Sequence, residues 1–318
     1  MRIRVLLAAV VVAYLGTAAT AADFVPDVLV VSNYPEKVVV PGPVLTDLPI
    51  SSSAQLLYYH TNGTQYPLRI EVTVTNPSAE SKHLDVLKSE AGPSADGIFA
   101  GHRAMVDFMS LLQKNQWRSV RIPPRGTYIV TYQALVTDKV SVGMISLKGT
   151  GLQLSMRVAD PAWPLNFAWN GQYPTFETIQ IANPVIQQSL TVSPEQTLIE
   201  MPVGHQPYLW DTLRAKELKG NYGVFYRYQI GLANPDPVYK KLTLYVSAIG
   251  GPTRATVKIN DRLVESSLLG CSGESEAQQI YETVLAPYQK ATPLNIELIP
   301  TAGSHYPINL VLRNSPFS

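Results

Sequence analysis

The stretch LRIEVTVTNP, residues 68–77, alternates apolar and polar side chains over eight positions and then stops at Asn76-Pro77. In an extended chain, such alternation puts every second side chain on the same face, whereas an amphipathic helix needs a spacing of three to four residues. The stretch therefore predicts a strand with one buried face that ends in an Asn-Pro turn.

The same alternation of apolar and polar residues, with a period of two, recurs in other segments of the chain. Each alternating run is short and is bounded by Gly, Pro, Asn or Asp. Many short strands with turn residues between them are typical of a β-sandwich or barrel and argue against an α/β fold. The further runs lie at residues 152–158, 226–232, 242–246, 294–298 and 308–312.

Two hairpins can be placed from turn residues. Asn62-Gly63 lies between the apolar residues 56–59 and a strand that begins near Pro67, and Asn-Gly supplies the positive φ angles of a type I′ turn. Asn260-Asp261 lies between residues 255–259 and Leu263-Val264 with weaker turn chemistry. We expect each pair of strands to be antiparallel neighbours.

Two segments carry helical spacing instead. The first begins near residues 93–97 and the second is closed by Pro287, with Ser275 and Gln278 spaced as a capping box. We expect each helix to cover the open end of a sandwich with its apolar face. The apolar positions are Met105, Phe108, Met109 and Leu112 in the first segment and Ala277, Ile280, Tyr281 and Val284 in the second.

The chain resembles itself at an offset of 158 residues (234 − 76), which aligns Asn76-Pro77 with Asn234-Pro235. Upstream, residues 48–50 (LPI) resemble residues 201–203 (MPV). We expect residues 28–158 and 170–318 to superpose with Asn76 and Asn234 at equivalent turns. Two unrelated sandwiches with common Asn-Pro turns are the alternative.

Two domains follow from the length and from this repeat. The copies meet at residues 159–164 (ADPAWP), a linker whose two prolines make it semi-rigid. The expected division is residues 1–22 for a signal peptide, 23–160 for the first sandwich and 161–318 for the second.

The N-terminus has the three parts of an export signal. Residues 1–4 (MRIR) are basic, residues 5–15 are apolar, and Ala19-Thr20-Ala21 is a small-residue cleavage site. The apolar run is too short to span a bilayer, which needs about 20 residues. We expect a mature protein that is secreted, periplasmic or on the cell surface, without a transmembrane segment.

The run TVTNP, residues 73–77, closes an alternating strand and is followed by a second one. This strand pair resembles that of bacterial immunoglobulin-like or fibronectin-like modules of cell-envelope proteins, over about 25 residues of each half. The resemblance implies an all-β protein of two tandem immunoglobulin-like β-sandwich domains with a binding, spacing or adhesive role. One short helix inserted in each half departs from the usual small module.

Composition and residue spacing give no indication of a cofactor or metal. The net charge is +1 and charged residues make up 15% of the chain, so nucleic acid is not an expected partner. Cys271 is the only cysteine, which excludes an intramolecular disulfide and a structural zinc site built on paired thiols. The five histidines show no His-x-His or His-x-x-x-His spacing.

No catalytic residues are assigned. Ser94, Asp96 and His102 contain the groups of a nucleophile, acid and base, but no Gly-x-Ser-x-Gly elbow accompanies them. We therefore interpret Ser94 or Asp96 as a helix cap.

One aromatic stretch, residues 163–176, interleaves rings with amide side chains. Such a composition suits either a sugar-stacking platform or a plug between domains. Its ligand or interdomain contacts would be Trp163, Trp169 and Tyr173.

Two functions remain from the sequence. In the first, the protein is an exported, non-enzymatic binding or structural module with an unidentified protein or glycan of the cell envelope as partner. In the second, it is a carbohydrate-binding or glycoside-active protein that uses residues 163–176. Paired carboxylates brought together by folding would favour a hydrolase.

Overall fold

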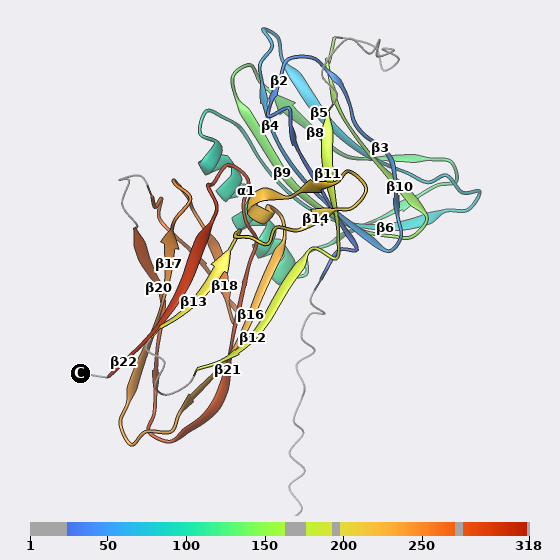
Figure 1. The fold of residues 1–318 in the computed structure, drawn as a ribbon. Helices are drawn as coiled ribbons and strands as arrows, with labels where there is room; N and C mark the ends of the chain where they lie inside the picture. The colour runs from blue at the N-terminus through green and yellow to red at the C-terminus, as the bar shows by residue number, and fades with distance from the viewer. Residues whose placement is uncertain (1–23, 163–175, 193–197, 271–275, 317–318) are drawn as a thin grey trace, which may run out of the picture.

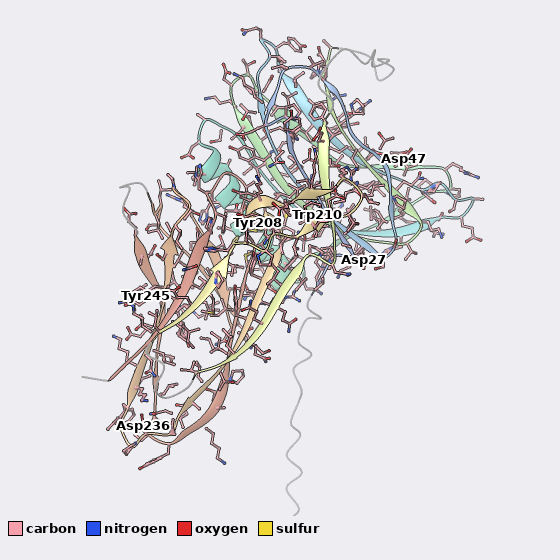
Figure 2. The ribbon with its side chains drawn as sticks, viewed as in Figure 1. Asp27, Asp47, Tyr208, Trp210, Asp236 and Tyr245 are labelled. Atoms are coloured by element: carbon pink, nitrogen blue, oxygen red, sulfur yellow. The ribbon has the colours of Figure 1, made fainter. Side chains whose placement is uncertain are left out.

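The computed structural model describes residues 24–162, 176–192, 198–270 and 276–316. The fold is all-β, and within these residues it contains a single α-helix. Two pairs of sheets form an upper and a lower sandwich in Figure 1. Figure 2 labels Asp27 beside their junction and Asp236 at the end of the second sandwich far from the first. In the described part of the chain, no helix is long and apolar enough to cross a membrane.

The first sandwich packs a seven-stranded sheet on a four-stranded one. The larger has the order β11 (Glu177–Ala182), β1 (Val28–Tyr34), β4 (Ser53–Asn62), β9 (Val140–Lys148), β6 (Lys82–Ser94) and β7 (Arg118–Ile122), with β2 (Lys37–Val38) beside β4. The smaller has the order β3 (Gly42–Ile50), β10 (Leu152–Ala159), β5 (Leu68–Thr75) and β8 (Thr127–Leu135).

The second sandwich has a five-stranded and a four-stranded sheet. Their orders are β12 (Val185–Thr191), β16 (Phe225–Asn234), β21 (Gln289–Leu298), β18 (Thr256–Ile259) and β19 (Arg262–Glu265), then β13 (Leu198–Val203), β22 (Ile308–Pro316), β17 (Lys240–Ala248) and β20 (Ala277–Leu285). Between β13 and β16 lies an inserted segment with β14 (Trp210–Asp211), β15 (Lys216–Glu217) and the 3-10 turn η1 (Lys219–Asn221).

The alternating stretch at residues 68–75 forms strand β5, as the sequence predicts. Leu68, Ile70, Val72 and Val74 are all buried, and they pack in the core between the two sheets of the first sandwich. Strand β9 differs because almost all of it is buried. Its sheet is covered on both faces, by the smaller sheet on one and by α1 and the second sandwich on the other.

The two sandwiches have the same strand order. If β11 and β2 are set aside, β1-β4-β9-β6-β7 corresponds to β12-β16-β21-β18-β19, and β3-β10-β5-β8 corresponds to β13-β22-β17-β20. In both, the first strand is parallel to its neighbour, β4 or β16. The domain division at residues 160 and 161 stays a prediction, and the pairing of β11 with β1 adds a segment beyond residue 160 to the first sheet.

The expected register of the repeat is wrong by one strand. Asn234 ends β16, whose counterpart is β4, so Asn234 corresponds to Asn62 at an offset of 172 (234 − 62), and Asn76 lies in the next connection. Successive strands share the period of two and end in similar Asn turns, so a slip by one strand preserves the pattern. The match of residues 48–50 with 201–203 is confirmed, because Ile50 lies opposite Leu152 and Val203 opposite Ile308.

The first helix is confirmed and the second is not. Helix α1 spans Gly97–Gln113, and its N-cap Asp96 accepts a hydrogen bond from the Phe99 amide at 2.9 Å. Residues 277–285 form strand β20, paired with β17, instead of a helix. A β-bulge at Ile280 puts both Ile280 and Tyr281 against the core, which imitates helical spacing in the sequence.

One of the two hairpins is also confirmed. Strands β18 and β19 pair across Asn260-Asp261, and Asn260 has a φ of 50°. The Asn62-Gly63 hairpin is wrong, because β4 and β5 belong to different sheets. Asn62 instead lies where the chain passes from one sheet to the other. Its side chain stabilises that connection, which is a turn but not a hairpin.

Candidate functional site

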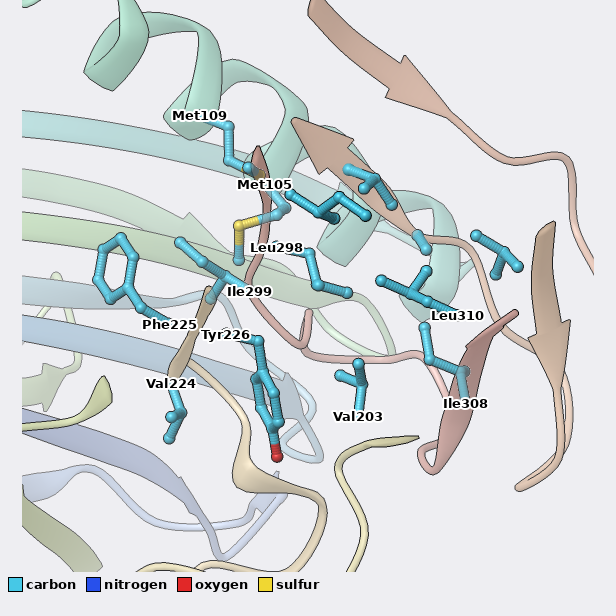
Figure 3. Packing of buried hydrophobic residues seen from close by; sticks show 14 of the residues in the cluster. Met105, Met109, Val203, Val224, Phe225, Tyr226, Leu298, Ile299, Ile308 and Leu310 are labelled. Carbon is cyan, nitrogen blue, oxygen red and sulfur yellow. The ribbon is translucent and has the colours of Figure 1, made fainter. Parts of the chain in front are cut away.

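The two sandwiches meet through one continuous buried cluster. It includes Leu29, Val31 and Leu57 from the outer face of the first sandwich, residues of α1, and the core of the second sandwich. Figure 3 shows Met105 and Met109 of α1 beside Leu298 and Ile299. A core shared in this way fixes the relative position of the two sandwiches, because separating them exposes apolar surface.

An aromatic group closes one side of this junction. The ring of Phe24 lies 5.0 Å from Trp117 and 6.5 Å from the fully buried Phe225, edge to face in both cases. The Lys148 ammonium lies 3.9 Å from the centroid of the Trp117 ring. In the described residues, these rings fill the space between the two sandwiches. From the sequence alone, residues 163–176 are a candidate for this role.

Polar contacts also cross the junction. The Gln55 side-chain amide donates to the Gly223 carbonyl at 2.9 Å, where both groups are buried. The His102 Nε2 lies 2.9 Å from a carboxylate oxygen of Glu265 on β19. Burial lowers the pKa of His102, and the neighbouring Glu265 opposes that effect. These bonds orient the sandwiches in addition to the apolar contact.

A cavity of about 280 Å³ opens at this junction. Four separate segments build it: the end of β1 and the following turn, β4, the inserted segment before β16, and the loop between β21 and β22. Its polar lining residues are Ser32, Asn33, Glu36, Tyr59, Tyr222, Ser304 and His305.

The wall from the second sandwich is held rigidly. The Tyr222 hydroxyl donates to the Ser304 carbonyl at 2.9 Å, and its ring lies edge to face with Tyr306 at 5.6 Å. Gly303 has a φ of 83°, and a Cβ there would collide with the backbone of Gly97 at the start of α1. The loop therefore needs glycine both for its conformation and for its close approach to the first sandwich.

The phenols in the cavity remain protonated at neutral pH. Burial raises the pKa of Tyr59, and the carboxylates of Glu36 and Asp96 add to this effect. Burial also raises the pKa of Tyr222. His305 donates from Nδ1 to the Pro252 carbonyl at 2.9 Å, because a carbonyl oxygen can only accept.

These groups suit the binding of a polar ligand by hydrogen bonds. Among the described residues that line the cavity, Glu36 is the single carboxylate, whereas glycoside hydrolysis uses two. In the same part of the chain, no three His, Cys, Asp or Glu side chains gather as a metal site. The lining thus offers recognition groups from both sandwiches in a fixed arrangement.

A larger hollow of about 560 Å³ lies beside strands β3 and β11. Its charged side chains are already engaged: Arg214 pairs with the buried Asp211 at 3.3 Å and Lys216 with Glu177, and Asp47 contacts the Ser155 hydroxyl. The junction cavity is the better candidate because both sandwiches contribute polar side chains to its lining.

The residues singled out in the sequence do not form this site. Trp163, Trp169 and Tyr173 lie outside the described residues, so their ligand or interdomain role stays a prediction. Ser94 donates to the Asp96 carbonyl and Asp96 caps α1. Ser94 and Asp96 thus bond to each other through the Asp96 backbone, whereas the His102 ring binds Glu265.

The residues of the cavity carry no local signal in the sequence. Glu36 and Tyr59 lie at least 163 residues (222 − 59) before Tyr222 and His305 in the sequence. Only the packing of one sandwich on the other brings them together, and no spacing among the five histidines of the sequence singles out His305.

Comparisons with known proteins assign no family. No family model and no curated protein matches the chain. A solved structure described as the triple jelly roll and turret assembly of an archaeal virus shows 10% identity and a TM-score of 0.19, covering 86% of this chain and 54% of that one. This chain therefore spans about half the length of that viral protein.

Two further solved structures have similar values. The tandem CBM22 domain of Xyn10C from Paenibacillus barcinonensis is 9% identical with a TM-score of 0.18, covering 88% of this chain and 92% of that one. Lac15 from a marine microbial metagenome is 11% identical with a TM-score of 0.15, covering 86% and 59%. At these TM-scores the likenesses carry no functional argument, and the immunoglobulin-like resemblance stays a prediction.

Proposed function

We propose that the protein is an exported, non-enzymatic binding module of the cell envelope or extracellular space, and that it holds part of a protein or glycan partner in the junction cavity. The observation that carries the proposal is that both sandwiches contribute polar side chains to one cavity, Glu36 and Tyr59 from the first and Tyr222 and His305 from the second.

The rigidity of the junction supports this function. A preformed site loses less conformational entropy on binding than a flexible one. The cavity, at about 280 Å³, lies just below the usual range of ligand-site volumes, which is about 300 to 1,000 Å³. It therefore matches one side chain or one sugar unit of a larger partner.

The experiment is sedimentation of the mature protein with separated cell-wall and membrane fractions of the source organism. The protein is recovered after export, and its intact mass should lack residues 1–21 or 1–22. Tyr59→Phe combined with Glu36→Gln should lower retention at least tenfold, because two hydrogen bonds to the partner are lost at about 1 kcal/mol or more each. The matched control is Tyr288→Phe with Glu217→Gln at exposed positions, which should leave retention unchanged.

Two results would contradict the proposal. The first is that neither fraction retains the wild-type protein. The second is turnover of an envelope glycan or ester by the purified chain, which would favour the glycoside-active alternative.

A further inference from the structure

Strand β12 forms an outer edge of the second sandwich (Figure 1). It runs parallel to β16 in unbroken register over all seven residues. The Pro184 carbonyl accepts from the Phe225 amide at 2.9 Å, and the Val192 amide donates to the Gly231 carbonyl at 3.2 Å. In a parallel strand, the backbone N–H and C=O groups of successive residues point to opposite sides. Because Pro184 and Val192 bond to β16, the even-numbered residues between them also point toward β16. The backbone N–H and C=O groups of Gln187, Ser189 and Thr191 therefore point away from the sheet.

The corresponding edge of the first sandwich is occupied. Strand β1 corresponds to β12, and β11 lies antiparallel along its outer side. Val30 lies opposite Leu56 and Gln188 opposite Tyr228, which are equivalent positions of β4 and β16. Gln187 and Ser189 thus correspond to Leu29 and Val31. Those two residues lie opposite Ile181 and Ile179 of β11.

The other sheet edges in the described residues are protected. Natural sheets block free edges with proline, bulges, charges, shortness or a covering segment. Strand β12 has no proline, no charged residue and no register shift. The protecting features elsewhere are Pro43 and Pro49 in β3, Arg118 and Arg121 in β7, bulges in β8 and β20, Glu200 and Pro202 in β13, the shortness of β19, and Asp211 bound to the Gln180 amide of β11.

We propose that the outer edge of β12, along which none of the described residues pairs, binds an extended segment of a partner protein, which adds antiparallel to β12 as β11 adds to β1. This deepens the proposed binding function by assigning a protein partner to a surface separate from the junction cavity. Main-chain hydrogen bonds to Gln187, Ser189 and Thr191 would supply affinity, as in other cases of strand addition.

The side chains of β12 define the chemistry of that segment. Ile186 and Leu190 are partly buried against the core, while Gln187 and Ser189 are exposed. The partner segment should therefore place apolar residues over Ile186 and Leu190 and uncharged polar residues on the opposite face. The chain's own β11, with the sequence ETIQIA, has such an alternation when it is shifted by one residue from its register on β1, which puts Ile179 and Ile181 on the face of Ile186 and Leu190.

The probe is a fluorescent peptide of residues 176–183, FETIQIAN, added to the full mature chain. The test variant is Ser189→Pro, which removes one outward N–H and leaves the ladder to β16 intact. Its matched control is Ser189→Thr, which changes the side chain and keeps the N–H. A peptide with Ile179→Pro serves as the non-pairing probe.

The peptide should bind wild type and Ser189→Thr with dissociation constants within twofold, and Ser189→Pro at least tenfold more weakly. In hydrogen exchange on the wild-type chain, the amides of Gln187, Ser189 and Thr191 should become protected when the peptide is added. This second measurement decides the question even where Ser189→Pro fails to fold.

Equal binding to all three chains, no binding, or binding without protection of those three amides would overturn the proposal. A concentration-dependent dimer that Ser189→Pro abolishes would also overturn it, because the edge would then belong to a second copy. The junction variant Tyr59→Phe with Glu36→Gln should keep peptide binding while losing envelope retention, so failure of one proposal is distinguishable from failure of the other.

Discussion

At the scale of single residues, buried asparagines organise the connections between sheets. The side-chain amides of Asn62, Asn76 and Asn234 each donate to the carbonyl four residues later and accept from the amide two residues later. Asn62 also donates to the Leu135 carbonyl at 2.8 Å and Asn234 to that of Leu285 at 3.4 Å. Leu135 and Leu285 end the equivalent strands β8 and β20, which confirms the corrected register at atomic detail.

His60 is a buried neutral group next to these connections. Its Nδ1 donates to the Pro35 carbonyl at 3.0 Å, so its Nε2 accepts from the Ser32 hydroxyl at 2.8 Å. The ring also lies edge to face with Phe176 at 5.7 Å. Burial lowers the pKa of His60 from 6.5 to about 4. Between pH 4 and 6.5, the His60 ring therefore binds a proton more weakly in the folded state than in the unfolded chain.

This shift predicts a loss of stability in mild acid. The contribution of His60 is fully present above pH 6.5 and falls as the pH drops to about 4, because the unfolded state binds more protons in that window. The loss should total about 3 kcal/mol in the free energy of unfolding, measured by urea titration between pH 4 and 8. His60→Gln, without a titrating ring, should flatten the profile over this window. Parallel profiles for the two proteins would contradict the assignment.

At the scale of elements, the two copies share a structural irregularity. In β8, the bulge lies between the positions opposite Val72 and Thr73, and in β20 between those opposite Leu244 and Tyr245. At the offset of 172 these positions coincide. The bulge twists two otherwise long edge strands, which hinders pairing with another chain.

Pairing of β4 with β9 depends on a glycine. Gly143 lies opposite Tyr58, and a Cβ at Gly143 would collide with the Tyr58 ring. Tyr58 is fully buried and its hydroxyl contacts Glu90 and Gln133 at 2.7 and 2.6 Å. The ring therefore has no space into which it can move.

Gly143→Ala should consequently lower the free energy of unfolding by about 1–3 kcal/mol, the usual cost of an overpacked core. The control is Gly231→Ala in β16, where the nearest atoms to a Cβ lie 3.9 Å away and the change should be close to zero. Urea unfolding of both variants measures the difference. Equal stabilities would show that the Tyr58 ring can yield.

At the scale of the whole molecule, the shared junction core makes the sandwiches one folding unit. The Phe225 side chain is fully buried in this core, and it contacts the ring of Phe24 from the N-terminal segment. We therefore expect one cooperative thermal transition instead of two.

Phe225→Ala should lower the stability of the whole chain by about 3–5 kcal/mol, because it leaves a cavity in the junction. Calorimetry should show that the single transition moves to lower temperature as one peak. Trp210→Ala is the control, since Trp210 is 50% exposed and the loss of its side chain should cost less than about 1 kcal/mol. Two separated peaks in the wild type would contradict the single unit.

The sequence by itself determined the β class, strand β5, the cap of α1 and the Asn260-Asp261 hairpin, because each depends on neighbouring residues in the chain. Only the tertiary structure decided that residues 277–285 are a strand, since a bulge paired to β17 disguised their period. It likewise decided the register of the repeat and the junction cavity. Those features depend on contacts between distant segments, and local patterns of apolar and polar residues cannot distinguish one strand partner from the next.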